Sequence, residues 1–273
     1  MRKTKKSRIA KTNVKKPRAT KKPDIKFSPL IGRDLRQDEP TEVGVSSLKH
    51  AYAAMNRGDL KEAKRIVEYA RLEWQVVHDM YVNWSWSFFT YIAETYGEEE
   101  LEKAMRSVLG SYYRARYDKV MASDVKTQVQ LTVEGLRGHL MGKNRQGEIQ
   151  VTEEEDRYVL RLDPCGSGGV ARQRVESGKE PRPDLFGFSK KAGPLTWGKE
   201  KVCYYCAHCS LVNEIMAIEN YGHPMRVTEY PEKVEDACLW YIYKDPKRIP
   251  AEYYERVGKT APPTAPRKSP KGT

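Results

Sequence analysis

The sequence lacks any long run of apolar residues. A membrane-spanning helix needs about 20 consecutive, mostly apolar residues, and no segment of this chain approaches that length. The first residues also lack the short apolar core of a secretory signal peptide, because Lys, Arg and Pro are frequent there. These absences exclude a membrane-spanning protein and predict a cytoplasmic one.

Common catalytic motifs are absent as well. The chain contains no phosphate-binding Walker loop, no H-E-x-x-H zinc motif, no Rossmann glycine set after a strand and no G-x-S-x-G nucleophile elbow. The sequence therefore does not predict a P-loop nucleotidase, a zincin protease, a dinucleotide-dependent enzyme or an α/β-hydrolase. Its chemistry has to come from other residues.

Acidic residues are scarce at both ends. Residues 1–26 hold twelve Lys or Arg and one acid, Asp24, and residues 259–273 hold four basic residues and no acid. The formal net charge is +12, so the part between the ends is slightly acidic and is not a basic nucleic-acid-binding domain. We predict a disordered basic tail over 1–26 and a disordered Pro/Lys tail over 259–273. Weak contact of the basic tail with nucleic acid or an anionic surface is a further expectation.

Residues 27–258 have the length of a single domain and begin as helices. Residues 46–142 carry apolar residues at helical spacing, and helix-capping residues and glycines divide them into four helices. The longest predicted helix follows the capping residue Asp59 and ends at Gly97.

Residues 143–258 favour short strands and carry all five cysteines. Alternating apolar and polar residues on both sides of an acidic turn predict a β-hairpin near 148–162, and two further strands are predicted later. Residues 166–196 are expected to form a long loop, and 210–221 a short helix that ends at Gly222. The predicted fold class is α+β: an N-terminal helical half, then antiparallel β-hairpins with a short packed helix and a cysteine-rich site.

The cysteines have an unusual spacing. Cys203, Cys206 and Cys209 form a C-x-x-C-x-x-C run, Cys165 lies in a glycine-rich turn, and Cys238 follows the run. Thiolates that are separated by two residues can bind one ion. An odd number of cysteines in a cytoplasmic protein favours metal or redox chemistry over disulfides.

Three interpretations of this spacing remain open. The whole run, with Cys165 or Cys238 as fourth ligand, is typical of a four-iron cluster. A zinc site is the second interpretation, with Cys206, Cys209 and His208 as ligands together with Cys165 or Cys238. Zinc with four protein ligands would be structural, whereas zinc with one open position would be catalytic. Without a metal, Cys209 would precede a helix that begins at Ser210, and a helix N-terminus stabilises a thiolate. Together with His208 it would then be a reactive thiol.

The turn that follows Cys165 is a candidate cofactor-binding segment. Gly166, Ser167 and Gly168 allow close backbone approach, and their successive N–H groups are suited either to an anion or to hydrogen bonds with a ligating sulfur. An ordinary hairpin exit is the structural alternative.

Two residues are candidates for proton transfer. His78 lies on the long predicted helix, next to Asp79 on a neighbouring helix face, and histidine titrates near neutral pH. Glu214 follows Cys209 by five residues and is placed to assist a metal-bound water. Each has a structural alternative as a packed or solvated helix residue.

Three elements of the sequence resemble those of a bacterial family. They are the Asp-Pro-Cys-Gly-Ser-Gly-Gly turn, the Tyr-Cys-Ala-His-Cys element at 205–209, and Cys238 with Trp240. This family is similar to the L-2-amino-thiazoline-4-carboxylate hydrolase-like proteins. The resemblance covers roughly residues 60–258 and implies a cytoplasmic, enzyme-like α+β domain with hydrolase activity.

The leading hypothesis is a cytoplasmic metal-dependent hydrolase that acts on a small organic molecule and carries zinc, or alternatively a 4Fe-4S cluster. The alternatives are an iron–sulfur or thiol redox protein, and a non-catalytic binding module that zinc stabilises while its tails attract nucleic acid.

Overall fold

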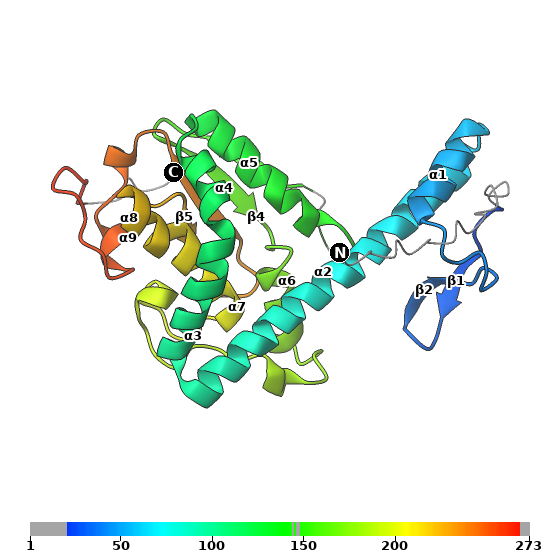
Figure 1. The fold of residues 1–273 in the computed structure, drawn as a ribbon, viewed down its shortest axis with the longest axis horizontal. Helices are drawn as coiled ribbons and strands as arrows, with labels where there is room; N and C mark the ends of the chain where they lie inside the picture. Colours follow the sequence, from blue (N-terminus) through cyan, green and yellow to red (C-terminus); the bar gives the residue numbers. More distant parts are fainter. Residues whose placement is uncertain (1–20, 144, 146–147, 268–273) are drawn as a thin grey trace, which may run out of the picture. The chain divides into compact units, whose positions relative to one another are not determined.

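The computed structural model describes residues 21–143, 145 and 148–267, and the chain divides into two compact units (Figure 1). The first unit ends at Arg71 and the second begins at Leu72. The boundary falls within helix α2 (Leu60–Tyr96). Two units differ from the single domain that we predicted over residues 27–258.

The first unit contains a β-hairpin of β1 (Ile25–Ser28) and β2 (Arg33–Arg36), followed by α1 (Ser47–Asn56). Its small core is built from alanines and an isoleucine: Ala51, Ala54, Ala63 and Ile66. Because β1 begins at Ile25, the disordered tail predicted over 1–26 is wrong at its C-terminal end. Residues 1–20 lie outside the described residues, so the rest of that prediction stays untested.

The helices of the second unit follow the predicted order. After α2 come α3 (Glu98–Met105), a π-helical turn at Arg106–Gly110, and α4 (Ser111–Met121), which together occupy the third predicted helix. Helix α5 (Val125–Arg137) begins at the predicted cap, because the Asp124 side chain accepts a hydrogen bond from the backbone N–H of Thr127 at 3.0 Å.

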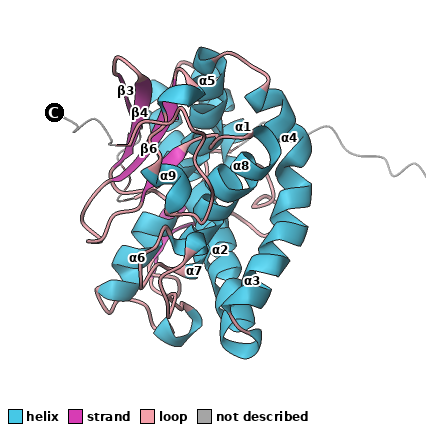
Figure 2. Ribbon diagram, turned by 90° about the vertical axis from the view of Figure 1, so that its left-hand side faces the viewer, coloured by secondary structure: helices cyan, strands magenta, loops and turns pink. Residues whose placement is uncertain are grey.

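A four-stranded antiparallel sheet completes the α+β fold (Figure 2). Its strand order is β3-β4-β6-β5, with β3 (Gln150–Glu153), β4 (Arg157–Leu162), β5 (Val227–Glu229) and β6 (Cys238–Tyr243). The β3–β4 hairpin was predicted from its alternating pattern. Apolar residues of α5 pack against the sheet in a core that contains Leu136, Leu160, Leu162, Trp240 and Ile242.

Part of the predicted loop 166–196 is helical. Helix α6 (Gly168–Glu176) forms there because tertiary packing outweighs a composition rich in Gly and charge. Arg172 on α6 is almost fully buried, with its guanidinium 4.6 Å from the centre of the Tyr230 ring, and it donates a 3.0 Å hydrogen bond to the carbonyl of Pro231.

The helix predicted at 210–221 begins six residues earlier. A continuous helical segment runs through α7 (Tyr204–Cys209), a π-helical turn at Ser210–Ile215 and α8 (Met216–Tyr221). It ends as predicted at Gly222, whose φ of 81° is readily adopted only by glycine.

The C-terminal segment packs on the second unit as far as the structure describes it. The last helix is α9 (Glu252–Glu255). The carbonyl of Pro266, which follows it, accepts a hydrogen bond from the backbone N–H of Ala251 at 2.8 Å, and Lys259 pairs with Glu219 at 2.6 Å. The disordered tail predicted over 259–273 is therefore wrong up to Arg267. Among the described residues, no helix combines the length and the apolar character that a membrane crossing requires.

A fully buried carboxylate joins the helical segment to the rest of the second unit. Glu214 accepts hydrogen bonds from the indole of Trp197 and the backbone N–H of Thr228, each at 2.8 Å, and pairs with Arg256 at 3.1 Å. Burial raises its pKa, whereas the charge of Arg256 opposes that rise. These contacts give Glu214 a structural role, and its predicted catalytic role stays untested.

Replacing Glu214 by Gln leaves Arg256 without its buried counter-ion, so we expect the free energy of unfolding to fall by about 3 kcal/mol. The matched control is Glu219→Gln, at a more exposed carboxylate that pairs with Arg106 and Lys259. This control should cost about 1 kcal/mol or less. Urea denaturation measures both, and equal losses would contradict the assigned role of Glu214.

Candidate functional site

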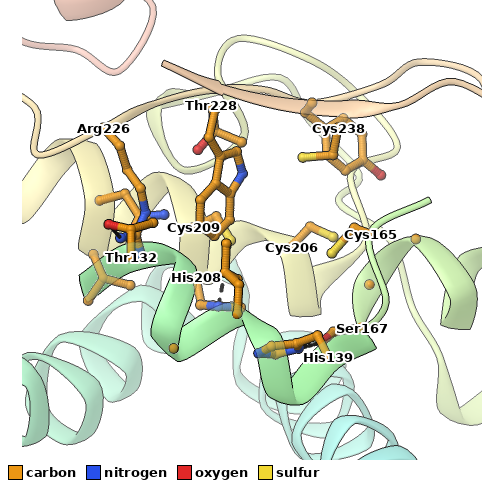
Figure 3. A pocket seen from close by; sticks show the side chains of 18 of the residues that line it. Thr132, His139, Cys165, Ser167, Cys206, His208, Cys209, Arg226, Thr228 and Cys238 are labelled. Carbon is orange, nitrogen blue, oxygen red and sulfur yellow. Dashed lines mark hydrogen bonds between the residues drawn. The ribbon is translucent and has the colours of Figure 1, made fainter. Parts of the chain in front are cut away.

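A cavity of about 200 Å³ lies in the second unit among α4, α5, α6, α7 and the strands β5 and β6. Its walls include several aromatic side chains, and Figure 3 shows polar and sulfur-containing side chains that face it. The aromatic residues are Tyr81, Tyr113, Tyr117, Trp197, Tyr205, Tyr230 and Trp240. The cavity brings together most of the residues that the sequence singled out.

Four of the five cysteines line this cavity, together with His208. Cys165 comes from the turn after β4, Cys206 and Cys209 from α7, and Cys238 from the start of β6 (Figure 3). All five cysteines are free thiols. Cys165 and Cys238 thus border the same cavity as two cysteines of the 203–209 run, and their predicted role as ligands of one ion stays a prediction.

Cys203 is the exception, because it does not line the cavity. It is fully buried and occupies the N-cap position of α7, where its sulfur accepts the backbone N–H of Cys206 at 3.3 Å. Burial opposes its ionisation, but the hydrogen bonds from Cys206 and the charge of Arg172 bring its pKa below the usual value.

The C-x-x-C-x-x-C run is helical. Cys206 and Cys209 are three residues apart on α7 and therefore share a face of the helix. Cys209 lies inside the continuous helical segment, so the prediction that a helix N-terminus activates it is wrong. Burial instead raises the pKa of Cys209 to about 12.

The glycine-rich turn surrounds the sulfur of Cys165 with backbone donors. The nearby backbone N–H groups of Gly169, Ser167 and Gly168 oppose the rise in the pKa of this thiol that burial causes. This effect favours the second arrangement that we considered for the turn, in which its N–H groups serve a sulfur, and that arrangement stays a prediction. Such donors stabilise a thiolate once it forms.

Two positions of the turn leave no space for a side chain. A β-carbon at Gly166 would lie 1.8 Å from the carbonyl oxygen of His139, and one at Gly168 would lie 2.5 Å from the sulfur of Cys206. Glycine is required there because neighbouring segments approach the backbone closely.

The thiols that line the cavity favour the neutral form. Burial raises the pKa of Cys165 and places that of Cys238 well above its usual value. A hydrogen bond with Cys203, together with burial, does the same for Cys206. A bound cation reverses this preference, because metal ions deprotonate the thiols that coordinate them. Within the described residues, no three His, Cys, Asp or Glu side chains are placed closely enough to hold a metal ion as they stand.

Another part of the cavity wall carries buried polar groups without partners. In the described part of the chain, the Nδ2 of Asn213, the Nε of Arg226, the Oγ1 of Thr228 and the Nε1 of Trp240 have no hydrogen-bond partner. All four residues line the cavity. Three of these groups only donate hydrogen bonds, so this wall is suited to a ligand with acceptor atoms.

This second wall was not predicted from the sequence. A signal was present at Asn213, which lies with Glu214 between the apolar residues Val212 and Ile215.

A chain of hydrogen bonds links the long helix α2 to the glycine-rich turn. The Nδ1 of His78 lies 3.0 Å from the Oδ1 of Asp79, and its Nε2 lies 3.0 Å from the Oγ of Ser167. We expected adjacent residues on a helix to point apart, yet both side chains join the same network. His78 is mostly buried and does not line the cavity, whereas Ser167 and His139 do.

His139 contacts the hydroxyl of Ser167 through Nδ1 and lies 3.0 Å from the Nε2 of His78. Burial, followed by the charges of His78, His208 and Arg145, lowers the pKa of His139 to about 4. This imidazole is therefore neutral at physiological pH.

Comparisons with protein-family models, curated proteins and solved structures find no match to this chain. The similarity to the L-2-amino-thiazoline-4-carboxylate hydrolase-like family stays a prediction that depends on the quoted motifs.

Gly166→Ala places a methyl group against the His139 carbonyl, so we expect it to lower the free energy of unfolding by about 3 kcal/mol or more. Gly193→Ala is the matched control, because a β-carbon there has no heavy atom within 4 Å. It should stay within about 0.5 kcal/mol of the wild type. Thermal and urea denaturation measure both, and a neutral Gly166→Ala would contradict the close approach.

The lowered pKa of His139 predicts acid sensitivity. Its folded-state pKa of about 4 lies below the unfolded value, so the unfolded chain binds the proton first as the pH falls. The stabilisation is complete above pH ~6.5 and is lost progressively toward pH ~4. Between pH 7 and 5, the wild type should lose about 2 kcal/mol more stability than His139→Gln. Urea denaturation at both pH values measures these losses, and equal losses of stability in the two proteins would contradict the prediction.

Proposed function

We propose that the protein is a cytoplasmic enzyme that hydrolyses a small organic molecule in this cavity and carries a metal centre held by cysteine thiolates. The observation that carries the proposal is that Cys165, Cys206, Cys209 and Cys238, from three separate segments, border one small cavity. Free thiols are also what a reducing compartment preserves.

The donor set suits a soft metal. Four cysteine thiolates are typical ligands of zinc and of iron–sulfur clusters. The backbone N–H groups directed at Cys165 support this assignment, because hydrogen bonds to sulfur stabilise a ligating thiolate. The sulfurs would have to move closer together to bind one ion, because no three of the described donor side chains are placed to hold a metal as they stand.

The number of ligands decides the role of the metal. Zinc bound by all four thiolates would be a closed structural centre, whereas three would leave a position at which zinc supplies Lewis acidity to a bound water. His208 is the reserve ligand, since its Nε2 lies 3.6 Å from the Cys209 sulfur while its Nδ1 contacts the Tyr205 carbonyl.

The second wall of the cavity supports a polar substrate. Arg226 stacks its guanidinium 4.4 Å from the centre of the Trp240 ring, and nearby Asn213 has a free amide donor. A substrate with a planar body and hydrogen-bond acceptors would satisfy these groups. The cavity volume of about 200 Å³ limits it to a small molecule.

One observation favours a second function, thiol redox chemistry. Cys203 and Cys206 form a C-x-x-C pair in which the N-terminal thiol has the lowered pKa and the second the raised pKa. This asymmetry is typical of dithiol oxidoreductases. However, Cys203 is fully buried, so an oxidant would have to reach it through Cys206.

Metal analysis of the full chain, purified without oxygen, tests the proposal. We expect about one zinc ion per chain, or iron with sulfide if the centre is a cluster. Replacing any of Cys165, Cys206, Cys209 or Cys238 by Ser should lower the metal content strongly, because thiolates supply most of the binding free energy.

Cys203→Ser is the matched control. Serine retains an acceptor at the N-cap of α7, and this residue lies outside the cavity wall. The variant should keep its metal. A wild-type protein without metal, or equal loss in all five variants, contradicts the metal centre. Unfolding of the metal-depleted protein without any hydrolytic activity of the loaded one would favour the binding-module alternative.

A further inference from the structure

The Asp79–His78–Ser167 chain defines the proton positions in the network. The carboxylate of Asp79 accepts a hydrogen bond from the Nδ1–H of His78 at 3.0 Å. This leaves the Nε2 of His78 with its lone pair facing the hydroxyl of Ser167, also at 3.0 Å. A hydroxyl, an imidazole and a carboxylate therefore lie in the order that removes a proton from serine.

Asp79 is held as a carboxylate. Burial opposes its ionisation, but the hydrogen bonds from His78 and Gln75 and the charge of Arg145 together bring its pKa below the usual value. Arg145 pairs with Asp79 and also donates to the carbonyl of Gly166 at 2.9 and 3.1 Å. One guanidinium thus positions both the carboxylate and the turn that carries Ser167.

His139 contributes a second imidazole to the same hydroxyl. Ser167 has one hydroxyl proton, so only one of the two imidazoles can accept it. With His78 as acceptor, neutral His139 carries its proton on Nδ1, which contacts the serine oxygen and also lies 3.0 Å from the Nε2 of His78. Donation to the serine oxygen would stabilise negative charge that develops on Oγ.

Ser167 itself does not make the contact that its position favours. It occupies the N-cap position of α6, yet its side chain makes no capping hydrogen bond. Serine is strongly preferred at this position because its side chain can cap the helix by accepting a backbone N–H. Here the hydroxyl faces two imidazoles instead, on a turn between a strand and a helix that borders the cavity.

We propose that Ser167 is the nucleophile of a hydrolytic acyl transfer in this cavity, with His78 as general base and Asp79 as positioning residue. The substrate class is a small ester or amide. The inference depends on the proposed hydrolytic use of the cavity, but it does not depend on the metal centre.

The reaction is balanced with water as the only co-reactant. The Oγ of Ser167 bonds to the carbonyl carbon, its proton passes to the Nε2 of His78, and the carbonyl π pair moves to oxygen. When the carbonyl re-forms, the bond to the leaving group breaks and that group takes the proton from His78. Water then attacks the acyl carbon and gives its proton to His78. The carbonyl re-forms as the bond between Oγ and the acyl carbon breaks, the carboxylic acid leaves, and Oγ takes the proton back from His78.

The phenol of Tyr205, which also lines the cavity, is a candidate donor to the oxyanion.

Labelling of the full chain with a small fluorophosphonate tests the proposal. Ser167 should gain the phosphonyl group as fluoride leaves, and peptide mass spectrometry locates the adduct. His78→Gln should slow labelling at least 100-fold, within the range attributed to general-base catalysis. Asp79→Asn should slow it at least 10-fold, whereas Asp79→Glu, which keeps the charge, should recover part of the rate. A merely structural role for Asp79 would not produce this difference.

Ser210→Ala is the matched control, because this fully buried serine bonds to the carbonyl of Pro194 and does not line the cavity. It should label at the wild-type rate, and Ser167→Ala should not label at position 167. Circular dichroism and thermal unfolding show whether each variant is folded. An unlabelled wild-type Ser167, or equal rates in the wild type and folded His78→Gln, overturns the proposal.

Metal content measured on the same samples separates this inference from the proposed metal centre. Labelled Ser167 in protein without metal supports the nucleophile and contradicts the metal. Bound metal with an unlabelled Ser167 supports the metal centre and contradicts the nucleophile.

Discussion

The site depends on the close approach of the turn backbone at Gly166 and Gly168 to two other segments. Gly166 faces the carbonyl of His139, which follows α5, and Gly168 faces the sulfur of Cys206 on α7. A side chain at either position would push these segments apart. The same contacts bring Cys165 to the other thiols and Ser167 to the histidines, so the metal centre and the nucleophile that we propose share one steric requirement.

The electrostatics of the cavity follow from burial. Burial favours the neutral forms of its thiols and of His139, whereas the pKa of Arg172 lies above its usual value because Tyr230 and the sulfurs of Cys203 and Cys206 outweigh the effect of burial. A zinc ion with four thiolates carries a net negative charge, and charges near this cavity are suited to balance it. Arg172 already interacts with the sulfurs of Cys203 and Cys206, and Arg226 with that of Cys209. Two arginines of the cavity wall, buried Arg172 and half-buried Arg226, therefore supply positive charge to the site.

Local patterns predicted the elements that local physics determines. The β3–β4 hairpin follows from alternation, the cap of α5 from Asp124, and the end of α8 from Gly222. Helix α6 was missed because the burial of Arg172 against Tyr230, which stabilises it, is a long-range contact. The start of α7 was missed because no standard capping residue precedes it: its N-cap is the sulfur of Cys203. The grouping of the cysteines was predicted from spacing, but their separation into four cavity thiols and one cap required the fold.

The glycine-rich turn resolves a conflict between sulfur and hydroxyl chemistry. Its backbone N–H groups are directed at Cys165, and the carbonyl of Gly166 is bound by Arg145. The side chain of Ser167 faces the imidazoles of His78 and His139. A metal bound at Cys165 would hold the turn without competing for the hydroxyl. In the enzyme that we propose, a thiolate centre would stabilise the geometry that activates the serine, and the two chemistries would occupy one cavity without sharing a ligand.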